Sequence, residues 1–185
     1  MAGKIGIFHG QYSISLKLIL YTDYTMNLRV VFNLLLVFLF AVVQGKSQRP
    51  GFDKSVFYKI IASGNADDID AQINILDVSL VPEKEAYGGA LLMKKSGLVI
   101  KAKNKVNLFK SGRSKLESSI SKEPGNIEYR FLRLIIQEHA PKMVKYRNKL
   151  EEDSKLIHTN FYSLSPFLQQ QITDYSKKSK ILKTP

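Results

Sequence analysis

The sequence predicts an all-α protein made of antiparallel helical hairpins, with about six or seven helices. From Phe52 onward, apolar residues recur at three- and four-residue spacing, which is the period of an amphipathic helix. No segment alternates apolar and polar residues as a half-buried strand does. Glycines, prolines and capping residues separate the periodic segments. Helices joined by such short connections pack antiparallel.

The first two expected helices form one hairpin. An apolar stripe from Phe52 to Ile61 predicts the first helix, and Gly64 is suited to end it in a left-handed conformation. The second helix begins at Asp67, because a carboxylate is favourable at the positive end of the helix dipole, and it stops before Pro82.

Two glycine-containing helices are expected next. The third helix spans 83–96 and carries Gly88, Gly89 and Ala90 in its interior. Because each interior glycine costs roughly 0.8–1 kcal/mol relative to alanine, we expect a neighbouring helix to press closely against this segment. A phosphate-binding glycine loop is the alternative, but no strand precedes it. The fourth helix spans about 105–121 and contains Gly112, which marks either a close helix contact or a local break.

The C-terminal part of the chain predicts three further helices. The fifth spans 126–139 and is apolar around most of its circumference, so we expect it to lie at the centre of the domain. The sixth runs from Pro141 to about Asn160, and the seventh starts at Ser165-Pro166 and extends to about Tyr175. The helical domain is therefore expected at 52–176, followed by a basic flexible tail at 177–185.

The segment 26–45 has the layout of a secretory signal peptide. Arg29 follows Met26, then Val30–Val43 contains a single polar residue, and a small-residue exit ends at Gly45. These fourteen residues are fewer than the ~20 apolar residues that a membrane-spanning helix needs. We therefore expect cleavage after Gly45 and export to the periplasm or the exterior. A segment retained as a membrane anchor is the alternative.

The expected export bears on how the flanking segments, the stability and the partner are interpreted. Residues 1–25 are interpreted as a misassigned or disordered extension before a start at Met26, and 46–51 as a linker. The chain has no cysteine, so the exported domain is stabilised without disulfides. The formal net charge of the whole chain is +12. Outside the cytoplasm, such an excess favours an acidic protein or an anionic envelope component as partner over nucleic acid, the alternative being a contribution to solubility alone.

Two resemblances follow from particular motifs. Residues 116–134 contain a helix, Pro124, the motif Asn126-x-Glu128-Tyr129 and a second helix, and so resemble the junction between tetratricopeptide-type repeats. This implies a tetratricopeptide-like array of hairpins. The segments FYKIIASGN, AYGGALLMKK, EYRFLRLIIQEHAPK and FLQQQITDYSKKS look like an uncharacterised exported family of Bacteroidetes-type bacteria. That resemblance implies localisation and fold, and it carries no activity.

The residues predict no catalytic centre, metal site or cofactor. His139 and His158 are the only histidines after the signal segment, nineteen residues apart and without cysteine partners. No serine lies in a nucleophile-elbow motif. Glu138 is a carboxylate at the unfavourable end of its helix, which predicts a structural ion pair with Lys142, Lys145 or an arginine. We therefore expect a protein that is not an enzyme.

A polar stripe on the fifth helix is the candidate interaction face. If the hairpins curve, this stripe lines a concave basic groove for an acidic peptide or polymer; otherwise it is a solvated face that keeps the domain soluble. The face comprises Arg130, Arg133 and Gln137, with Lys142, Tyr146 and Arg147 just beyond the helix.

Overall fold

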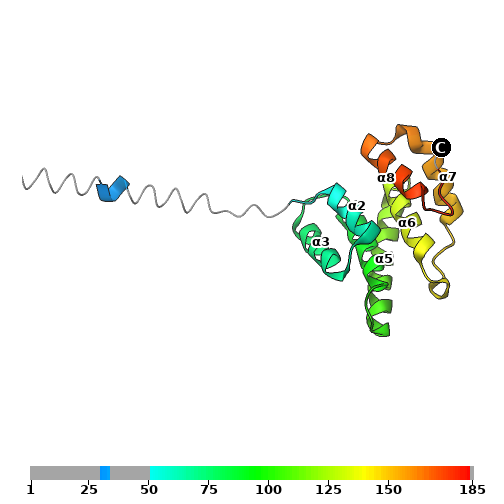
Figure 1. Cartoon of the computed structure of the whole chain (residues 1–185), viewed down its shortest axis with the longest axis horizontal. Coiled ribbons are helices and arrows are strands. Elements are labelled where there is room, and N and C mark those ends of the chain that lie inside the picture. Colours follow the sequence, from blue (N-terminus) through cyan, green and yellow to red (C-terminus); the bar gives the residue numbers. More distant parts are fainter. Residues whose placement is uncertain (1–29, 34–50, 184–185) are drawn as a thin grey trace, which may run out of the picture. The chain divides into compact units, whose positions relative to one another are not determined.

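The computed structural model describes residues 30–33 and 51–183. Residues 51–183 form one compact unit of α-helices and short 3-10 helices, and these described residues include no strand (Figure 1). The prediction of an all-α fold with antiparallel helices is confirmed. Residues 30–33 form a helical turn of their own. The remainder of the predicted extension, signal segment and linker lies outside the described residues, apart from Gly51. No helix in the described ranges is long and apolar enough to cross a membrane.

The first hairpin consists of α2 (Lys54–Ser63) and α3 (Ala66–Val78). The side chains of Asp53 and Asn65 accept hydrogen bonds from backbone N–H groups in the first turn of each helix, as capping residues do. Gly64 ends α2 in an extended conformation, with φ −62° and ψ 145°, so the predicted left-handed cap is wrong. A glycine is needed at this position because there is no room for a side chain: a Cβ would lie 2.7 Å from the carbonyl oxygen of Ile60.

The second hairpin, α4 (Lys84–Ser96) and α5 (Ala102–Lys122), is the most closely packed pair of helices. A Cβ on Gly89 would lie 2.7 Å from the carbonyl oxygen of Gly112, and a Cβ on Gly112 would lie 2.5 Å from that of Gly89. The two backbones therefore touch at a glycine-to-glycine crossing, and the predicted close contact at this helix is confirmed. Gly88, by contrast, faces open space.

Helix α6 (Ile127–His139) is central, as predicted. It packs against α4, α5 and α7, and its apolar side chains are buried on several sides. Asn126 caps its first turn by accepting from the N–H groups of Glu128 and Tyr129.

The sixth helix is shorter than predicted. After Pro141 the chain forms the 3-10 helix η1 (Lys142–Val144), and Lys145 then adopts a left-handed conformation with φ 47°. The α-helix α7 begins only at Leu150 and ends at Asn160. The break turns the buried Tyr146 toward α5, where its hydroxyl donates to Glu117. The chain thus forms a hydrogen bond to a distant segment at a place where the spacing of apolar residues predicted a continuous helix.

The chain ends with η2 (Phe161–Ser163) and α8 (Pro166–Ser176), whose N-cap is Ser165. The prediction of a flexible tail from residue 177 is wrong as far as Lys183. Leu182 is fully buried, and Ser179 is buried as well. The carboxylate of Glu138 accepts from the Ser179 hydroxyl at 2.6 Å and from the Lys180 N–H at 2.6 Å. The helical domain therefore extends past 176 because Glu138 anchors the segment that follows α8.

Candidate functional site

Three of the six residues of the predicted interaction face are buried. Arg133, Gln137 and Tyr146 are buried, and Arg133 is only 3% exposed. Of the six residues, Lys142 and Arg147 are exposed. The prediction that the stripe lines a groove or faces solvent is therefore wrong for the three buried residues, and the six do not form one accessible patch.

An ion-pair network explains why Arg133 is buried. Its guanidinium binds the fully buried carboxylate of Asp153 on α7 through two hydrogen bonds of 2.7 Å each. A third hydrogen bond of 2.8 Å joins Nη1 of Arg133 to Glu117 on α5. Although burial opposes its charge, the hydrogen bonds and charges of Asp153 and Glu117 hold the pKa of Arg133 above its usual value. The network ties α5, α6 and α7 together.

Arg130 extends this network to its edge. It donates to Glu152 at 3.1 Å and to Asp153 at 3.4 Å, and it also donates to the carbonyl oxygen of Pro124. Its side chain is 12% exposed. Both arginines of the stripe are thus neutralised by acidic groups of the same chain. The polar side of α6 therefore joins this helix to its neighbours in the fold.

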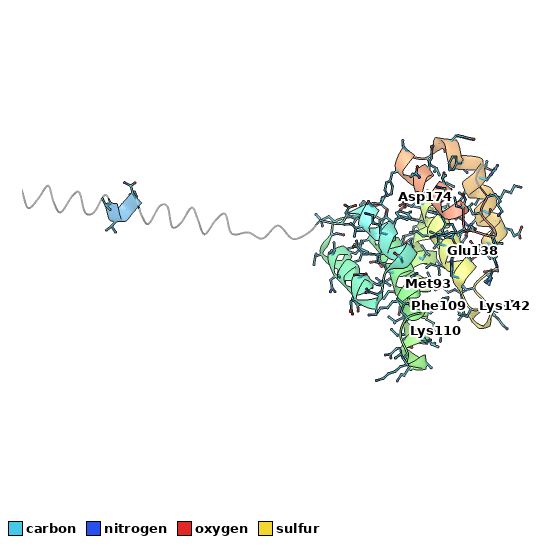
Figure 2. All side chains as sticks on the ribbon, viewed as in Figure 1. Met93, Phe109, Lys110, Glu138, Lys142 and Asp174 are labelled. Atoms are coloured by element: carbon cyan, nitrogen blue, oxygen red, sulfur yellow. The ribbon has the colours of Figure 1, made fainter. Side chains whose placement is uncertain are left out.

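A large apolar groove lies elsewhere, between residues of α2, α4, α5, α6 and α8. Its volume is about 830 Å³. Met93 from α4, Phe109 and Lys110 from α5 and Asp174 from α8 are four of its lining residues (Figure 2). Leu98 and Val106 also line it, and they leave 45% and 50% of their surface exposed. We call this feature the apolar groove.

Packed aromatic rings from three helices line the groove. Tyr58 stacks on Phe131 with ring centroids 6.0 Å apart, and Tyr175 meets Phe131 edge-on at 5.7 Å. The hydroxyl groups of the two tyrosines are engaged by carboxylates: Tyr58 donates to Glu128 and Tyr175 donates to Glu138. The hydroxyl groups of these two tyrosines are therefore already occupied.

Positive charge gathers around the apolar groove. Five basic side chains line it, against one carboxylate, Asp174. Asp174 is engaged by Lys177 at 2.6 Å and by Gln170 at 2.8 Å. The five are Lys94, Lys105, Lys110, Arg113 and Lys178. Arg113 lies over the ring of Tyr146, with its guanidinium carbon 4.9 Å from the ring centroid.

Lys94 and Lys178 line the groove without a carboxylate partner among the described residues, as Lys105 and Lys110 also do. Within residues 51–183, neither ammonium group has a carboxylate within ion-pair distance, whereas Lys54, Lys95 and Lys115 each pair with one. Partial burial, and after it the charge of Lys178, lowers the pKa of Lys94. The two ammonium groups therefore repel each other at the groove.

Two local devices position this pair. The glycine-to-glycine crossing fixes α4 against α5, because Met93, the residue before Lys94, packs directly over Gly112. At the other element, Glu138 anchors Tyr175, Ser179 and Lys180 on both sides of Lys178. Burial opposes ionisation of Glu138, but these hydrogen bonds outweigh it and lower its pKa. Glu138 is thus a structural acceptor, with different partners from the basic residues that the sequence suggested.

One histidine also lies at the groove. His139 lines the groove, and its Nδ1 lies 3.0 Å from the carbonyl oxygen of Ile135, within its own helix. Among the described residues, no group of three or more histidine or acidic side chains is placed to hold a metal ion. Sequence reasoning missed the groove. Its one local signal was the pair of apolar residues Leu98 and Val106 within a lysine-rich segment.

Fold and site together define the class of this protein as an all-α domain with an apolar, cation-lined groove. No protein family, curated protein or solved structure matches the chain. The resemblances to tetratricopeptide-type repeats and to an exported bacterial family accordingly stay predictions.

Proposed function

We propose that this chain is an exported, non-enzymatic binding domain and that its ligand lies in the apolar groove. One observation carries the proposal: a groove of about 830 Å³ with apolar walls remains open in an otherwise packed helical domain. Ligand sites have volumes of roughly 300–1,000 Å³, mostly apolar linings and a few polar groups that orient the ligand. The groove has all three properties.

The exposed side chains support the same conclusion. Leu98 and Val106 would be covered by an apolar ligand, and covering apolar surface contributes about 25 cal/mol per Å². Export is supported by the signal-peptide layout of 26–45. The partner class expected from the charge, an acidic protein or an anionic envelope component, agrees with the basic residues around the groove.

Titration with a neutral apolar dye tests the groove. N-phenyl-1-naphthylamine fluoresces when it leaves water, so binding to the purified full chain is expected to be saturable. The double variant Leu98→Asp/Val106→Asp places two charges in the groove wall and is expected to weaken dye binding by at least about tenfold, the equivalent of 1.4 kcal/mol.

The matched control is Val78→Asp/Leu80→Asp, which adds the same charges at exposed positions outside the groove. It is expected to bind the dye like the unaltered chain. The comparison also separates the groove from the apolar segment 30–43, because both variants retain that segment. Equal loss in the two variants, or the absence of saturable binding, contradicts the proposal.

Export has its own test. Mass spectrometry of the N-terminus in cell fractions is expected to find a chain that starts at Lys46 in periplasmic or secreted material. An intact segment 26–45 recovered in membranes would instead support the alternative, a membrane-anchored structural factor of the envelope.

A further inference from the structure

We infer that Lys94 and Lys178 hold the acidic head group of a single-chain amphiphile, whose apolar chain lies in the groove. This inference rests on the proposed function, because it names the ligand class of the same groove. It adds the head group, its two binding residues and the form of the tail.

The first argument is charge. Lys94 and Lys178 come from α4 and from the segment after α8, and both line the groove. No carboxylate within residues 51–183 pairs with either, and Asp174 beside them is already bound by Lys177 and Gln170. An acidic head group bound by these ammonium groups would gain charge-assisted hydrogen bonds that no carboxylate of the described residues already supplies.

The fold holds the backbone near the two lysines in place before any ligand arrives. Backbone contact at Gly89 and Gly112 fixes α4, and Glu138 fixes the chain on both sides of Lys178. A site whose backbone is already ordered loses less conformational entropy on binding.

The second argument is the chemistry of the space beside them. Tyr58, Phe131 and Tyr175 line the groove with packed rings, and Met93 adds an adaptable wall. The lining is mostly apolar, so it suits a hydrocarbon chain, whereas an extended peptide would leave backbone N–H and C=O groups without partners.

Displacement of the neutral dye tests the inference on the full chain. Dodecanoate and dodecanol have the same chain length and differ in the charge of the head group. Below their micelle-forming concentrations, dodecanoate is expected to displace N-phenyl-1-naphthylamine at a concentration at least about tenfold lower than dodecanol. Dodecyltrimethylammonium is expected to displace it less effectively than dodecanol.

The variant Lys94→Met/Lys178→Met is expected to remove the preference for dodecanoate, with each displacement referred to the dye affinity of the variant itself. Lys94→Arg/Lys178→Arg is expected to retain the preference. The control Lys59→Met/Lys155→Met removes two exposed lysines away from the groove, so it lowers the net charge equally and is expected to change neither the preference nor the dye affinity.

Each remaining outcome overturns one of the two proposals. If the dye binds in the groove but dodecanoate and dodecanol displace it equally, the inference fails and the proposed function stands. If the dye shows no groove-dependent binding, the proposed function itself fails. A third outcome is that phosphatidylglycerol vesicles capture the chain through Lys94 and Lys178 while dodecanoate displaces no dye. The two lysines then bind a membrane surface, and the inference fails. Displacement of the dye by an acidic helical peptide more effectively than by dodecanoate also overturns it.

Discussion

Within residues 51–183, basic side chains are paired with carboxylates between α6 and α7 but not at the apolar groove. Between α6 and α7, Arg130 and Arg133 form ion pairs with acidic side chains of the same chain, which neutralise their charge. These side chains are Glu117, Glu152 and Asp153. At the apolar groove, Lys94 and Lys178 have no carboxylate partner among the described residues. A net charge of +12 does not reveal this division.

The residue types suit the two roles. Arginine presents a planar fork that binds a carboxylate through two hydrogen bonds, which is what Arg133 does with Asp153. Lysine is a compact charge on a flexible stem, so it can adjust to a ligand that arrives from solution. The comparison predicts that breaking a pair between α6 and α7 destabilises the fold, whereas removing a lysine at the groove does not.

The largest effect is expected from Asp153→Ala. This variant leaves Arg133 buried without the carboxylate that binds two of its nitrogens. Breaking a buried pair by removing one partner costs about 3–5 kcal/mol, so urea unfolding should show a loss of that order. Glu152→Ala removes an exposed partner of Arg130 and is expected to cost far less.

A second variant separates charge from packing. Arg133→Met/Asp153→Leu removes both buried charges together, and replacement of a buried pair by apolar residues is often neutral. It is expected to recover most of the stability lost in Asp153→Ala. If the double variant is as unstable as the single one, burial of an unpaired arginine is not the cause.

The next effect concerns the crossing that supports Lys94. Gly89→Ala would bring a Cβ within 2.7 Å of the Gly112 carbonyl oxygen and 2.8 Å of the Leu116 nitrogen, both backbone atoms. Overpacking of this kind costs about 1–3 kcal/mol. Gly88→Ala meets nothing within 4 Å and should gain up to ~1 kcal/mol in helix propensity. Thermal unfolding of the two variants should therefore shift in opposite directions, and a shared direction would contradict the close crossing.

Glu138→Gln tests the anchor on the other side of the groove. The carboxylate accepts from Tyr175, Ser179 and Lys180, and an amide keeps only one acceptor atom, so we expect a loss of about 1–3 kcal/mol in urea unfolding. Because folding lowers the pKa of Glu138, its contribution is full above the ordinary glutamate pKa of ~4.3 and disappears as pH falls through the lower folded value. The difference between the two proteins should thus shrink below about pH 4. A difference independent of pH would exclude an ionised acceptor.

Local features of the fold were predictable from sequence. The helix-interior glycines predicted a close crossing because backbone contact requires the absence of a side chain, and Gly89 and Gly112 confirm it. Apolar residues around most of the circumference of 126–139 predicted a central helix, since each apolar face needs a neighbour. Glu138 was identified as a residue in need of a partner.

Features that depend on distant partners were not predictable. Arg133 and Gln137 formed a polar stripe in the sequence, but the acids that allow Arg133 to be buried lie on α5 and α7. The break after Lys145 depends on the bond between Tyr146 and Glu117, 29 residues apart in the chain. The apolar groove combines residues from five helices, and Lys94 and Lys178 are 84 positions apart by their sequence numbers. No local period records such a juxtaposition.

The smallest effect, and the sharpest contrast, is expected from two adjacent lysines on α4. Lys95 pairs with Asp70, so Lys95→Met should lower stability slightly. Lys94→Met removes a partly buried charge that Lys178 repels, so stability should be unchanged or raised by about 0.5 kcal/mol or less. Because folding lowers the pKa of Lys94, the unfolded chain binds more protons near the ordinary lysine pKa of ~10.4, and stability from this residue rises as pH approaches that value. Urea midpoints between pH 8 and 10 should show this rise in the unaltered chain and a flatter profile in Lys94→Met; destabilisation equal to that of Lys95→Met would mean that Lys94 has a structural partner after all.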